Sequence, residues 1–172
     1  MKKQTSPFFY ALLAIIGLLV VVGVNAATDS VTATVTAQNV AVSLSQSSFD
    51  YGTIDNNTAS STLLLWGGAG IVATNDGNVN EDFDINGADT ASWTLAGSVA
   101  ENNYMHQFCN DTDDDCASPP TNYTALTTSP ATLKNTIAAS GTCAFQLRLT
   151  TPNPSTVYTQ QSASVTITAS AS

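Results

Sequence analysis

The chain has 172 residues and a formal net charge of −9, with four Lys and Arg against thirteen Asp and Glu. So few cations give the chain no means of neutralising phosphate groups, which excludes nucleic acid as a partner. Anionic membrane surfaces are excluded for the same reason, because attraction to them needs basic clusters. Beyond residue 26 the sequence is rich in Thr and Ser and poor in the usual helix formers, a composition that favours β-strands.

The first 26 residues have the organisation of a secretory signal. Two lysines precede an uncharged apolar run, Phe8 to Val24, and small residues follow it up to Ala26. The run is slightly shorter than the roughly 18 residues expected of a membrane-spanning helix, which favours cleavage after Ala26 over a retained membrane anchor, the alternative reading. The sequence therefore predicts a signal peptide or anchor at 1–26 and one domain at 27–172. It also predicts a secreted or cell-surface location, with membrane contact only through an uncleaved N-terminal segment.

The predicted domain begins with an alternating segment, Asp29 to Gln38. One face carries only small apolar side chains, and the opposite face carries Thr; the apolar set is Val31, Ala33, Val35 and Ala37. Strict alternation predicts a half-buried strand. Beyond Gln38 the apolar residues move to even positions, beginning at Val40. Such a slip reverses the buried face of a strand, so the sequence predicts a bulge or a crossing between sheets at this point.

Further strands follow at short intervals along the chain. The apolar run Ser61 to Trp66 is typical of a central strand, and Asp76-Gly77 predicts a tight turn between two strands. In the segment after that turn, Phe83 and Ile85 are expected to point inward.

The C-terminal half carries the clearest alternation. Asn103 to Cys109 is interpreted as a strand, and Cys143 to Thr150 and Ala163 to Ala169 as the two strands of a hairpin. In all, eight to ten short strands with polar turns are expected, and no amphipathic helix. The predicted fold is all-β, a single immunoglobulin-like antiparallel β-sandwich.

Two stretches resemble the WxL-type surface domains of bacteria. One is TATVTAQNVAVSLSQSSFDYGTI, from Thr32 to Ile54, and the other is Trp93-Thr94-Leu95. This resemblance implies attachment to a cell-envelope polymer. The N-terminal strand and the Asn-x-Gly hairpin also look like exported immunoglobulin-like sandwiches, including biofilm-fibre subunits of the TasA kind. That second resemblance implies a homopolymer of the chain itself.

The three cysteines predict one disulfide and one free thiol. An exported chain meets an oxidising environment, and an odd number of cysteines leaves one over. Cys109 and Cys116 bracket a short acidic loop, whereas Cys143 lies on the apolar face of its strand. We therefore expect a Cys109–Cys116 bridge and a buried, unpaired Cys143. A zinc site made by His106 with the three cysteines is the weaker alternative, because exported thiols oxidise.

The acidic loop is also a candidate calcium site. Asp111, Asp113 and Asp115 alternate like the first three ligands of a calcium loop, and Ca²⁺ takes hard oxygen ligands at this spacing. The position that is normally Gly is Cys116 here, and the position of the bidentate Glu is Asn122. The sequence thus predicts at most weak calcium binding, and no other cofactor.

No catalytic constellation is visible. His106 is the single histidine; on a strand it shares a face with Tyr104 and Phe108, while Cys109 points to the opposite face. A Cys-His nucleophile pair is therefore disfavoured, and we expect a histidine packed among aromatic side chains and no enzyme. The function expected is an exported structural or adhesive protein of the cell surface, a filament subunit that assembles by donating its N-terminal strand. The alternative is an extracellular carbohydrate- or ligand-binding module.

Overall fold

The computed structural model describes residues 27–172 except 66 and 69, so the expected signal peptide or anchor at 1–26 lies outside the described residues. The chain divides into two units, Met1–Thr36 and Ala37–Ser172. Within the described residues the second unit holds ten strands and one short helix, α2 (Thr62–Leu65). The strands are β1 (Val42–Leu44), β2 (Ala59–Ser61), β3 (Ile71–Asn75), β4 (Glu81–Gly87), β5 (Thr94–Leu95), β6 (Asn103–Asn110), β7 (Thr124–Ala125), β8 (Ala131–Ile137), β9 (Thr142–Thr150) and β10 (Val165–Ala171).

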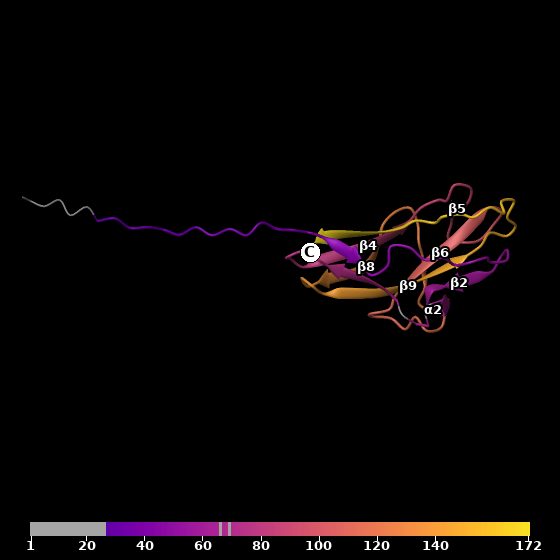
Figure 1. Ribbon diagram of the computed structural model, residues 1–172, viewed down its shortest axis with the longest axis horizontal. Helices are drawn as coiled ribbons and strands as arrows, with labels where there is room; N and C mark the ends of the chain where they lie inside the picture. The colour runs from indigo at the N-terminus through magenta and orange to yellow at the C-terminus, as the bar shows by residue number, and fades with distance from the viewer. Residues whose placement is uncertain (1–26, 66, 69) are drawn as a thin grey trace, which may run out of the picture. The chain divides into compact units, whose positions relative to one another are not determined.

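The strands form two sheets of unequal size, which confirms the predicted all-β sandwich (Figure 1). The larger sheet has seven strands in the order β1-β3-β9-β6-β5, with β2 paired to β9 and β7 paired to β6. The smaller sheet has three strands in the order β10-β4-β8. The pairs are antiparallel except for β5 with β6, which is parallel.

The core lies between the inner faces of the two sheets. From the smaller sheet Phe83 and Ile85 are fully buried, as their alternation predicts. From the larger sheet β9 contributes a row of side chains on one face; the row consists of Cys143, Phe145, Leu147 and Leu149, all buried. At about 25 cal/mol per Å² of apolar surface removed from water, this contact is the main stabilisation of the unit.

Two connections that the sequence presents as hairpins cross between the sheets instead. The turn at Asp76-Gly77 joins β3, in the larger sheet, to β4, in the smaller sheet. The C-terminal strands β9 and β10 likewise belong to different sheets, so the predicted C-terminal hairpin is wrong. Alternation identifies a strand and its buried face, but it does not identify the neighbour with which the strand pairs.

The expected strand at Ser61–Trp66 is also wrong. Only β2 (Ala59–Ser61) is extended, and the chain then enters α2. The Ser61 hydroxyl accepts a hydrogen bond from the Leu64 N–H at 3.4 Å, the position of a helix N-cap. A run of three leucines suits a helix as well as a strand, and the cap decides in favour of the helix.

Candidate assembly site

An open groove of about 1300 Å³ lies between the two sheets. The larger sheet lines it with Ile71 from β3 and with Phe145, Leu147 and Leu149 from β9. The smaller sheet lines it with Val165 and Ile167 from β10. Two stretches without strand structure, residues 46–56 and 157–164, complete the lining. The side chains from the larger sheet are at most 7 % exposed, whereas Val165 and Ile167 are only half-buried, so the accessible apolar surface of the groove that the sheets supply lies on β10.

The groove exists because the smaller sheet is three strands wide and the larger sheet is five strands wide along its main path. Phe83 and Ile85 on β4, the middle strand of the smaller sheet, are 0 % exposed. The inward residues of β10, by contrast, are only half-buried; they are Val165, Ile167 and Ala169. The inner face of the larger sheet beyond β10 is covered by irregular chain rather than by a fourth strand.

The β10 strand presents a free edge beside this groove. Among the described strands it pairs with β4 alone. Its sequence, VTITASA, contains no charged residue and no proline. The outer edge of such a strand carries unpaired N–H and C=O groups, which favour the addition of another strand.

The other edges of the two sheets are protected in recognisable ways. β8, at the opposite edge of the smaller sheet, carries Lys134 and shows register shifts against β4. It also holds Thr136 at φ 55°, outside the strand conformation. In the larger sheet the terminal strands β1 and β5 have three and two residues. Charge, irregularity and short length are the usual means of blocking edge pairing, and β10 has none of them.

The alternating N-terminal segment forms no strand in the structure, contrary to the sequence prediction. Residues 27–40 are exposed, and the side chains of Val31 and Val35 are 93 % and 95 % exposed. The one hydrogen bond recorded within residues 27–36 joins the Ser30 N–H to Asp29 Oδ1. A strand is stable only beside another strand, and this segment has none within the described residues. The compact unit accordingly begins at Ala37, ten residues after the predicted domain start.

The acidic loop is closed by the predicted disulfide. Cys109 and Cys116 are bonded, and Cys143 is a free, buried thiol, as expected. Both bridged cysteines pack with Tyr123 in a small buried cluster beside the main core. A stable disulfide indicates that the protein works in an oxidising compartment. No helix in the described part of the chain has the length and apolar character to cross a membrane.

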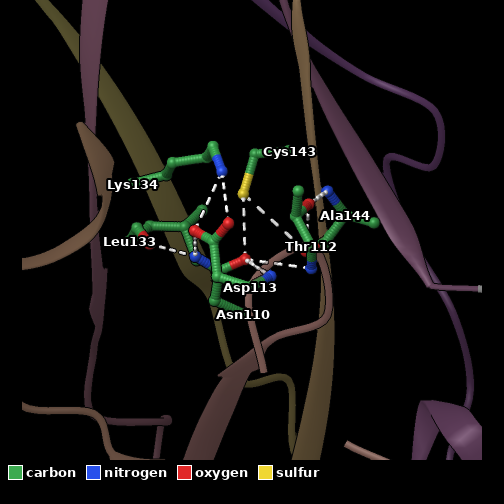
Figure 2. A network of polar contacts seen from close by, with 7 residues as sticks. All are labelled: Asn110, Thr112, Asp113, Leu133, Lys134, Cys143 and Ala144. Carbon is green, nitrogen blue, oxygen red and sulfur yellow. Dashed lines mark hydrogen bonds and ion pairs between the residues drawn. The ribbon is translucent and has the colours of Figure 1, made fainter. Parts of the chain in front are cut away.

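The three aspartates of the predicted calcium site bond to separate partners. Asp111 Oδ2 accepts a hydrogen bond from Gln146 Nε2 at 2.9 Å, and Asp115 Oδ1 accepts one from the Ala117 N–H. Asp113 forms an ion pair with Lys134, with the Nζ 2.7 Å from Oδ1 (Figure 2). The Lys134 hydrogen bond lowers the pKa of Asp113. These bonds hold the loop against β8 and β9, and the described residues contain no cluster of three metal-ligating side chains.

The residues of the alternative zinc set are likewise not brought together. Two of the cysteines are oxidised to the disulfide. The Cys143 thiol lies 3.6 Å from Asn110 Oδ1, inside the polar network of Figure 2, and burial raises its pKa. His106 bonds elsewhere, to Tyr51. The thiol is thus held in its neutral form, which binds zinc poorly.

His106 is packed among aromatic side chains, as the sequence predicts. It is 1 % exposed, and its Nε2 lies 3.0 Å from the Tyr51 hydroxyl. Its Nδ1 has no hydrogen-bond partner among the described residues. Burial lowers the pKa of His106 to about 4, so the ring is neutral at physiological pH. The bond to Tyr51 ties the irregular stretch 46–56 to β6 and thereby fixes one wall of the groove.

Sequence reasoning missed the groove and the residues that shape its wall. Nothing in the sequence predicts that Tyr51 bonds to His106 or that β10 lies at the edge of its sheet. The absence of charge and proline in Val165–Ala171 was the available signal, since edge strands of soluble proteins normally carry one or the other.

The state of the cysteines can be checked by labelling. In unfolded, unreduced protein a thiol reagent should modify Cys143 alone, because the other two sulfurs are bonded to each other. Removing the bridge with a Cys109→Ser, Cys116→Ser variant should lower the free energy of unfolding by about 2–3 kcal/mol, as expected for so short a loop. Labelling of Cys109 or Cys116 without reductant would contradict the pairing.

Stability should depend on His106 at mildly acidic pH. In the unfolded chain its imidazole binds a proton near pH 6.5, whereas in the folded protein it stays neutral down to about pH 4. Between these values the unfolded state binds more protons, so the free energy of unfolding should fall with falling pH, by about 1.4 kcal/mol per pH unit from this group. A His106→Gln variant should lack this slope in urea titrations. Equal slopes in wild type and variant would show that His106 does not titrate in this way.

Three features of the described residues bear on function: the free β10 edge, the groove beside it and the exposed alternating segment. The first two lie within the unit 37–172, and the third precedes it in the chain. In comparisons with known proteins, no family model, curated protein or solved structure matches the chain.

Proposed function

We propose that the protein is an exported filament subunit that assembles by strand donation. Residues 29–38 of one copy would lie in the groove of the next copy and pair with the free edge of β10. The observation that carries this proposal is that one chain contains both an acceptor and a donor. The unprotected edge of β10 lies beside the groove, and the segment 29–38, with alternating apolar residues that are exposed, has no strand partner among the described residues. The two are complementary because strand addition satisfies backbone groups while side chains fill the groove.

The length of the donor segment agrees with the length of the acceptor edge. β10 has seven residues, and the irregular stretch 157–164 extends the same side of the groove. The donor segment has ten residues with an apolar side chain at every second position. A strand of this length and period would add a fourth strand to the smaller sheet and place Val31, Ala33 and Val35 beside the half-buried side chains of Val165 and Ile167.

Small side chains in the donor favour this fit. The groove is already lined by large residues, among them Phe145 and Ile167, so Val and Ala fill the remaining space without overpacking it. Burial of Val31 and Val35, which are almost fully exposed in the single chain, would supply the driving force. Charge on the donor is low, with Asp29 alone at its start.

Head-to-tail donation gives an open polymer. The donor and the acceptor are different surfaces of the same molecule, so each copy can donate once and accept once. Such heterologous contacts form fibres unless the rotation between copies closes a ring. A free N-terminus at residue 27 is required, which is the reason that cleavage after Ala26 belongs to the same proposal. A surface filament of this kind would serve the structural or adhesive role expected from the sequence.

A carbohydrate-binding module is the second candidate. The groove is also lined by Tyr51, Trp93 and Tyr158, and the side chain of Tyr158 is 82 % exposed. Aromatic faces of this kind suit the apolar faces of sugars. The polar side chains of residues 46–56 and 157–164 could also bond to sugar hydroxyl groups, whereas the free edge of β10 favours the strand. Binding of oligosaccharides by a monomeric variant, without any effect on assembly, would favour this second function.

Strand donation can be tested with charges placed on either face of the donor. A Val35→Asp variant should stay monomeric at concentrations at which wild type forms filaments, with the half-assembly concentration raised by at least about tenfold, because burying a Val stabilises by about 1.5–3 kcal/mol. The matched control, Thr34→Asp, puts the same charge on the polar face and should assemble. Sedimentation and negative-stain microscopy measure both.

The Val35→Asp monomer should still accept a synthetic peptide of residues 29–38, because its groove is intact. Filaments of Val35→Asp equal to those of wild type would contradict the proposal. So would wild-type protein that remains monomeric, with its N-terminus at residue 27, at every concentration and salt tried.

A further inference from the structure

The end of the donor segment and the residues that directly follow it are held by hydrogen bonds to the β3–β4 connection. The Asn78 side chain makes two of them: its Oδ1 accepts from the Asn39 N–H, and its Nδ2 donates to the Ala37 carbonyl, both at 2.8 Å. The Asn78 N–H donates to the Asn39 carbonyl at 3.1 Å, and the Asp76 N–H donates to the Ala41 carbonyl at 2.8 Å. We call this set of bonds to residues 37–41 the clamp.

A buried carboxylate completes the clamp. Glu81, at the start of β4, is 0 % exposed, and its Oε1 accepts a hydrogen bond from the Ala41 N–H at 2.9 Å. Alternate residues of the chain, Ala37, Asn39 and Ala41, are thus bonded in succession before β1 begins at Val42. The clamp continues the edge of the larger sheet although no strand is assigned there.

Close packing at Gly77 is part of the same arrangement. A Cβ atom at this position would overlap with Glu81 Oε1 and with the Asn39 carbonyl oxygen. Its N–H donates to Asn75 Oδ1 at 2.8 Å, which fixes the turn. Any side chain here would push residue 39 away from the turn, so glycine is required for the clamp to close.

The clamp begins within the donor segment itself. Ala37 is the last residue of the alternating apolar set and is also the first residue bonded to Asn78. If residues 37–41 were free, they would form a flexible joint with an end-to-end distance of about 12 Å. With the clamp closed, the backbone is held from the end of the donor segment to the start of β1.

We propose that Asn78, Gly77 and Glu81 are positioning residues that make the joint between successive subunits stiff. This inference rests on the strand-donation function proposed above. The acceptor groove determines whether one subunit binds the next, whereas the clamp determines how firmly the bound strand is oriented relative to the sandwich that donates it. A closed clamp gives a straight filament, and an open clamp gives a chain of loosely hinged subunits.

The test compares the curvature of filaments from full-length mature variants. Asn78→Ala removes two bonds of the clamp, and Gly77→Ala forces residue 39 outward; Asn80→Ala and Gly97→Ala are matched controls. Asn80 is exposed, and it accepts a hydrogen bond from the Ser172 N–H through its backbone carbonyl, which Ala retains. A Cβ atom on Gly97 would meet nothing within 4 Å. Electron microscopy should show a persistence length shorter by about threefold or more for Asn78→Ala and Gly77→Ala, and unchanged for the controls.

Peptide binding separates this inference from strand donation itself. The acceptor groove is untouched in the Asn78→Ala protein, so its affinity for a peptide of residues 29–38, measured on the Val35→Asp background, should equal that of the parent. Asn78→Ala remains informative if Gly77→Ala does not fold. Asn78→Ala filaments as straight as those of wild type would overturn the clamp and leave strand donation standing, whereas wild-type protein that forms no filaments would overturn both.

Discussion

The inequality of the two sheets is the constraint on which the rest of the structure depends. A three-stranded sheet packed on a seven-stranded sheet cannot cover the larger inner face with strands alone. Residues 46–56 and 157–164 cover the remainder as irregular chain, and the groove opens between them. The same inequality leaves β10 at an edge that carries neither charge nor proline. A fourth strand would pair with the free backbone edge of β10 and cover its half-buried side chains, and residues 29–38 have the pattern that such a strand needs.

The other features of the sandwich keep the walls of this groove in place. The Tyr51–His106 bond ties the 46–56 stretch to β6, and the buried ring of His106 stays neutral at physiological pH. On another part of the sandwich, the disulfide closes the acidic loop. The Asp113–Lys134 ion pair holds that loop against β8 (Figure 2). Because Asp113 and Lys134 are partly exposed, the ion pair contributes little stability. Its role is to fix the loop, while the stability comes from the apolar contact between the sheets.

Local patterns in the sequence were sufficient for the fold class and for most buried faces. Alternation identified the buried residues of β4 and β9, and the spacing of the cysteines identified the bridge. The pairing of the strands could not be predicted in the same way. Strands β3 and β4 follow one another along the chain but lie in different sheets, and the same is true of β9 and β10. The three leucines after Ser61 formed a capped turn of helix, since a short apolar run does not distinguish helix from strand. The segment 29–38 was predicted to be a half-buried strand but forms no strand in the structure, because alternation says nothing about whether a neighbouring strand is available. The edge of β10 and the groove depend on tertiary contacts alone.

The most direct measurement is amide hydrogen exchange, followed residue by residue in dilute protein and in assembled protein. The strand-donation model predicts that amides of residues 29–37, unprotected in the monomer, and amides on the outer edge of β10 gain protection together, to the same extent and at the same protein concentration. Amides on the edge of β8 should not change, since that edge is already blocked. Protection of the N-terminal segment without protection of β10, or assembly that leaves both segments freely exchanging, would contradict strand donation at this groove.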